Sequence, residues 1–135
     1  MAFNAKQSNK EYLEEATLNL VDPETGVELE VDGKPVSITV YGAASPKHRK
    51  AVDVLQGNKR KRGNREATLA ESRSESLEFL VALSKDTSNF VDDDELPITT
   101  AEQFRTLYGD EHISWIRDQV TSFIGEPNSF MKRNS

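Results

Sequence analysis

The chain has no cysteine, and its 135 residues contain no long apolar run. The absence of cysteine excludes a disulfide framework, a thiol nucleophile and a cysteine-ligated metal site. No apolar stretch approaches the roughly 18 residues that a membrane-spanning helix needs. The first residues also lack the apolar core of a secretory signal peptide. We therefore expect a soluble intracellular protein with no membrane partner.

Residues that could carry out catalysis are also sparse. The two histidines, His48 and His112, stand far apart and in no spacing typical of metal ligands. Serine, histidine and aspartate occur without a nucleophile elbow. The glycines lie at turns and do not form a phosphate-binding loop. We expect a protein that is not an enzyme and that uses no metal or cofactor.

Charge is abundant and is unevenly distributed along a chain whose net charge is −6. Residues 47–65 hold eight cations and one acid, Asp53, a net charge of +7. An acidic run follows downstream. Such a polarised chain is expected to contact a partner, including another copy of itself. The candidate contact residues are the basic block Lys47, Arg49, Lys50, Lys59, Arg60, Lys61, Arg62 and Arg65, and the acidic run Asp92, Asp93, Asp94 and Glu95.

Each charged segment has more than one interpretation. The basic block could contact phosphates, or it could be the solvated end of a helix or a protein contact. Proteins that bind single strands interleave aromatic residues, and residues 42–78 contain none, so nucleic acid is the less favoured partner. The acidic run lacks the spacers and the glycine turn of a calcium loop. It is interpreted as a solvated loop or as a patch for a basic partner.

The N-terminal third has the patterning of short antiparallel strands. Apolar and polar residues alternate over about 16–21, 27–31 and 36–41. Turn signals separate these segments, with Pro23 and Gly26 at the first turn and the Asp32-Gly33 pair at the second. This pattern predicts a β-hairpin or meander, with strands confined to residues 16–41.

Helical patterning follows. Ser45 and Pro46 predict the start of a helix that ends near Gly63. A capping box is predicted at Thr99 with Glu102. The four helices are expected at about 46–63, 66–84, 100–108 and 111–124, with a loop over 85–97. The last helix should bury a stripe that includes Trp115.

The predicted fold class is α+β, mostly α, with a short N-terminal antiparallel hairpin or meander followed by about four helices. The length suits one domain, 1–135, with a modest core. Residues 1–15 and 128–135 are expected to be flexible, although Phe130 and Met131 are candidates for docking onto the core.

The order of these features carries a resemblance. The segment 36–42 (VSITVYG) precedes 45–51 (SPKHRKA) and a basic helix; a leucine-rich segment, 77–83, follows. Near the end come 115–120 (WIRDQV), Phe123-Ile124 and 128–130 (NSF). Over about residues 16–131, this order resembles the tail assembly chaperones of long-tailed, siphovirus-type bacteriophages. One departure is 125–127 (GEP), where relatives often keep a continuous helix.

The resemblance implies a non-structural phage protein that is absent from the mature virion. Many copies would bind and solubilise the tape measure protein in the host bacterial cytoplasm. Tail tube protein would then displace them, with recruitment through a longer, frameshifted form. The alternatives are a nucleic-acid-binding or regulatory module that uses residues 47–65, and another phage tail morphogenesis protein.

The charge pattern is compatible with a coating role. A basic patch at 47–65 and an acidic patch at 92–95 would allow head-to-tail association between copies, and such contacts generate rings or open helices. We therefore expect a homo-oligomer.

Overall fold

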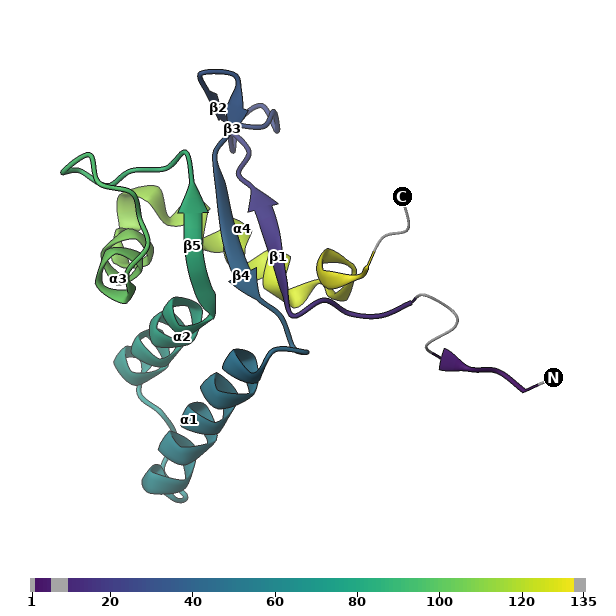
Figure 1. Ribbon diagram of the computed structural model, residues 1–135. Coiled ribbons are helices and arrows are strands. Elements are labelled where there is room, and N and C mark those ends of the chain that lie inside the picture. The colour runs from purple at the N-terminus through teal and green to yellow at the C-terminus, as the bar shows by residue number, and fades with distance from the viewer. Residues whose placement is uncertain (1, 6–9, 133–135) are drawn as a thin grey trace.

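The computed structural model describes residues 2–5 and 10–132. It has the mixed α+β architecture that was predicted, with more helix than strand (Figure 1). The strands are β1 (Glu15–Asn19), β2 (Glu30–Val31), β3 (Lys34–Pro35), β4 (Ser37–Tyr41) and β5 (Ser84–Ser88). The α-helices are α1 (Pro46–Arg62), α2 (Leu69–Leu83), α3 (Ala101–Gly109) and α4 (Ser114–Gly125). Two short 3₁₀ helices are η2 (Glu111–Ile113) and η3 (Pro127–Phe130).

Both predicted turns are present. Asp22 Oδ1 accepts hydrogen bonds from the backbone N–H groups of Glu24 and Thr25, which closes the first turn. Asp32 and Gly33 have φ angles of 55° and 75°. Positive φ at both central residues is what a type I′ hairpin turn requires. The second turn joins β2 to β3, and this pair forms a separate ribbon at one end of the molecule (Figure 1).

The main sheet has three antiparallel strands in the order β1-β4-β5. The prediction that strands are confined to residues 16–41 is wrong. A further strand, β5, pairs with the edge of β4 that β1 does not occupy. The sequence of β5, Ser-Lys-Asp-Thr-Ser, has no apolar alternation. An edge strand needs backbone pairing on one side only, and polar or charged side chains are common there. The segment 85–97 is therefore a loop only after Ser88.

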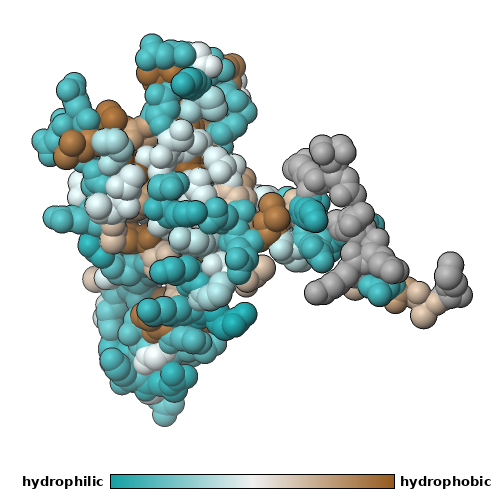
Figure 2. All heavy atoms as spheres, in the orientation of Figure 1, coloured by the Kyte–Doolittle hydropathy of each residue, from teal (hydrophilic) through white to brown (hydrophobic). Residues whose placement is uncertain are grey.

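The core lies between the sheet and the helices. Ile38, Val40 and Val120 are fully buried, and α4 lies behind the sheet in the view of Figure 1. The opposite face of the sheet is mainly polar (Figure 2) and is only partly open to solvent, since Thr39 and Tyr41 of β4 are half-buried. Trp115 is only partly buried and packs against the core from its margin. The predicted stripe on α4 therefore has Ile116 and Val120, not Trp115, at its centre.

Helix starts follow local sequence closely. The Ser45 side chain accepts from Lys47 N at the start of α1, as predicted. The capping box at α3 joins Thr100 and Gln103, so the predicted Thr99–Glu102 pair is wrong by one residue. Gln103 Oε1 accepts from the N–H groups of both Thr99 and Thr100, which satisfies two donors ahead of the helix. The helix predicted to begin near 111 is divided into η2 and α4.

The two ends of the described chain pair with each other. Leu13 N donates to Phe130 O over 2.6 Å, and Lys132 N donates to Glu11 O over 2.7 Å. Phe130 docks on the core and is buried. Residues 1, 6–9 and 133–135 lie outside the described residues, so the flexibility expected for 1–15 and 128–135 stays a prediction.

Candidate protein-interaction surfaces

The basic block lies on a helical hairpin, α1 and α2, which we call the arm. The arm projects from one end of the sheet (Figure 1), and α1 packs mainly against α2. At the contact between the two helices Ala51 is buried, and the His48 ring meets the Phe79 ring edge-on at 5.6 Å. The other faces of α1 are left to solvent.

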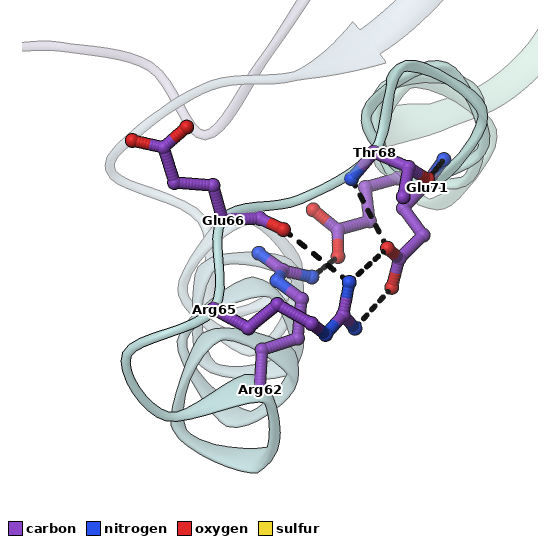
Figure 3. Close-up of polar contacts among 6 residues, drawn as sticks. Arg62, Arg65, Glu66, Thr68 and Glu71 are labelled. Carbon is purple, nitrogen blue, oxygen red and sulfur yellow. Dashed lines mark hydrogen bonds and ion pairs between the residues drawn. The ribbon is translucent and has the colours of Figure 1, made fainter.

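Two arginines of the block hold the arm together. Arg62 forms an ion pair with Glu75, and these side chains are 14% and 21% exposed. Arg65 donates from both terminal nitrogens to Glu71, at 2.7 and 3.0 Å (Figure 3). The Arg65 guanidinium, with help from the Thr68 N–H, lowers the pKa of Glu71 to about 2. Since Glu71 also caps α2 through Thr68, these contacts join the end of α1 to the start of α2.

The remaining cations of the block are free for a partner. Among the described residues they have no ion-pair partner, and all are exposed. We call them the basic face: Lys47, Arg49, Lys50, Lys59, Arg60 and Lys61.

The acidic run is divided in the same way. Asp92 Oδ1 accepts from the N–H groups of Asp94 and Leu96, and its Oδ2 accepts from Gln103 Nε2 at 2.9 Å. The Gln103 contact, followed by the backbone N–H donors, lowers the pKa of Asp92. Asp92 therefore shapes the loop, and Glu95, at φ 61°, completes its turn. The side chains of Asp93 and Asp94 are exposed.

A groove of about 560 Å³ lies beside this loop, between it and α3, and we call it the acidic groove. Its floor contains the buried residues Ile98, Leu107 and Ile116. Phe90, Val91 and Ile113 complete its apolar lining. Five acids and no cation are found among the described residues that line it, so its rim is strongly negative. These acids are Asp92, Asp93, Asp94, Glu102 and Asp110.

The C-terminal end of the basic face, with Lys59, Arg60 and Lys61, and the acidic groove lie at opposite ends of the molecule. Lys47, at the start of α1, instead lines a hollow together with Ala101 and Arg105 of α3. In Figure 1 the end of α1 is at the bottom, whereas the loop after β5 is at the upper left. The sequence predicted both charged segments but missed Glu102 and Asp110 as members of the groove. Their positions in the sequence could have indicated them: Glu102 is in the first turn of α3, and Asp110 directly follows its last residue, Gly109.

No group of three or more histidine, cysteine, aspartate or glutamate side chains that could hold a metal ion occurs in the described part of the chain. None of the helices described is both long and apolar enough to cross a membrane. Comparison of the chain with models of protein families, with curated proteins and with solved structures gave no match.

Proposed function

We propose that this protein is a non-enzymatic assembly chaperone that coats a long partner polypeptide, as the tail assembly chaperones of siphovirus-type phages do. The observation that supports this most directly is the placement of the basic C-terminal end of α1 and the acidic groove at opposite ends of one chain. Complementary surfaces placed in this way let each copy bind the next in the same orientation. Such contacts generate open helices or rings around a long partner.

The partner proposed from the resemblance is the tape measure protein, a long helical polypeptide with apolar faces. Apolar side chains exposed at both ends of the molecule would add weak contacts with such a partner; examples are Val27, Val31, Val54 and Leu69. Charged rims mainly affect association rates and salt dependence. That property suits a coat which tail tube protein displaces in the host bacterial cytoplasm and which the finished virion lacks.

The test is co-expression with the large, coiled-coil-rich reading frame expected next to this gene. The soluble fraction of that partner should rise when the chain is present. It should fall again when Lys59, Arg60 and Lys61 are changed to glutamate. A matched control changes Lys34, Arg73 and Lys132 to glutamate; these are exposed cations outside the basic face, and the control should solubilise like wild type. A partner equally insoluble with and without the wild-type chain would overturn the proposal.

The second candidate is a nucleic-acid-binding or regulatory module, favoured by the six exposed cations of the basic face. Against it, Arg62 and Arg65 are already paired with Glu75 and Glu71, which leaves fewer groups for phosphates. Duplex DNA binding that weakens steeply between ~50 and ~200 mM salt would favour this candidate. Fluorescence anisotropy of a labelled duplex measures it.

A further inference from the structure

We propose that the acidic groove receives helix α1 of a second copy of this chain. The inference rests on the proposed function, and it adds the interface through which successive copies would bind. The contacting surface of α1 would be one stripe, Lys47, Lys50, Val54 and Lys61, which we call the α1 stripe.

The groove has the features of a site for an amphipathic basic helix. Its floor of Ile98, Leu107 and Ile116 can accept an apolar side chain, and burial of apolar surface is the main source of binding energy. Its rim carries acidic side chains. A wholly apolar partner would remove water from these carboxylates without pairing them, which is unfavourable. A segment with one apolar anchor between cations satisfies both parts of the groove.

The α1 stripe is such a segment. Its members stand at positions i, i+3, i+7 and i+14, which share one face of an α-helix. Val54 is 58% exposed although it is apolar, and the three lysines on either side of it are exposed. The stripe spans roughly 21 Å at 1.5 Å per residue, so its cations can reach acids at both ends of a groove.

The occupant must come from another molecule. Within one chain, α1 is held against α2 by the Arg62–Glu75 ion pair, at the end of the molecule opposite the groove. The rim acids that would face the lysines are exposed: Asp93, Asp94, Glu102 and Asp110. A groove on one copy and a helix on the next make a heterologous interface, which repeats from copy to copy.

The test uses two variants that each lose one half of the interface. The helix variant carries Lys50→Gln, Val54→Gln and Lys61→Gln, and the groove variant carries Asp93→Asn, Asp94→Asn and Glu102→Gln. Asp92 is kept because it shapes the loop. Each variant alone should self-associate at least about tenfold more weakly than wild type, since both the apolar anchor and the charge pairs contribute. Sedimentation velocity measures this, and thermal melts check that both variants stay folded.

Mixing the two variants gives the decisive result. The helix variant keeps an intact groove and the groove variant keeps an intact α1, so the mixture has one good interface and should form 1:1 dimers that grow no further. A matched control, Leu69→Gln, removes an apolar side chain that is 67% exposed but lies outside the stripe, and it should associate like wild type.

Three outcomes overturn the inference: no dimer in the mixture, variants that self-associate like wild type, or a Leu69→Gln effect as large as that of the helix variant. If wild type still solubilises the tape measure protein in any of these cases, only the interface is wrong. A wild-type chain that stays monomeric and solubilises nothing removes both proposals.

Discussion

The ring of Phe130 lies directly against the backbone of Gly42. A Cβ built on residue 42 would lie 2.5 Å from Phe130 Cδ1, closer than any side chain tolerates. Phe130 is buried, and its backbone oxygen also accepts a hydrogen bond from Leu13 N. The contact with Gly42 therefore joins η3 to the residue that follows β4.

Gly42→Ala should therefore destabilise the fold by about 1–3 kcal/mol, the cost of overpacking. Gly57→Ala is the matched control, because nothing lies within 4 Å of a Cβ at that helical position. That change should instead stabilise by roughly 0.5–1 kcal/mol. In a Phe130→Ala background, Gly42→Ala should lose most of its effect. Urea unfolding of the four variants measures these differences, and equal costs for Gly42→Ala in both backgrounds would contradict the contact.

The buried hydroxyl of Tyr108 supports a second prediction. Ser84 Oγ donates to Leu80 O at 2.8 Å, so the 2.6 Å contact between Ser84 and Tyr108 places Tyr108 as the donor. Tyr108→Phe removes that bond and should cost about 1 kcal/mol of unfolding free energy. Tyr12→Phe, at an exposed tyrosine, should cost nothing measurable.

The same tyrosine predicts a dependence on alkaline pH. Burial raises the pKa of Tyr108 from 10.0 to about 12. Between these values the unfolded chain loses the proton and the folded chain keeps it, so unfolding free energy falls as pH rises above 10. In Tyr108→Phe the unfolding free energy, measured by urea titrations at several pH values above 10, should fall less steeply with pH than in wild type. An unchanged slope in the variant would show that the hydroxyl is not the group responsible.

Acid should loosen the arm. The pKa of Glu71 is lowered from 4.5 to about 2 by Arg65 and by the Thr68 N–H. The unfolded chain therefore binds the proton first as pH falls, and the stabilisation is lost progressively between these values. Glu71→Gln should remove this part of the acid dependence and lower stability near neutral pH. The measurement is thermal melting against pH, with Glu24→Gln, an exposed turn residue, as the control.

Neighbouring cations on α1 should behave differently. Arg62→Ala breaks the partly buried pair with Glu75 and should cost about 1–3 kcal/mol of stability. Lys61→Ala, one residue earlier, removes an exposed cation and should leave the melting temperature unchanged while weakening self-association. Melting and sedimentation on the same two variants separate the roles. A stability loss for Lys61→Ala would mean that the basic face supports the fold.

Features that depend on local geometry could be predicted from the sequence. The Asp32-Gly33 pair indicated its turn because few residues tolerate positive φ, and Ser45-Pro46 indicated the start of α1 because both suit a helix N-terminus. The basic block and the acidic run could also be identified, since the order of charged residues is read directly from the sequence. The polar β5 was not, because its pairing uses backbone groups that every residue shares.

The sequence by itself thus determined the α+β class, the basic helix and the acidic segment. Only the tertiary structure decided which charges are free: Arg62 and Asp92 are engaged within the chain, while Lys61 and Asp94 are exposed. The tertiary structure also forms the acidic groove, from the loop that follows β5 and from α3 and α4. The physical reason is that ion pairs and grooves depend on which segments pack side by side, and long-range packing has no local signature in the sequence.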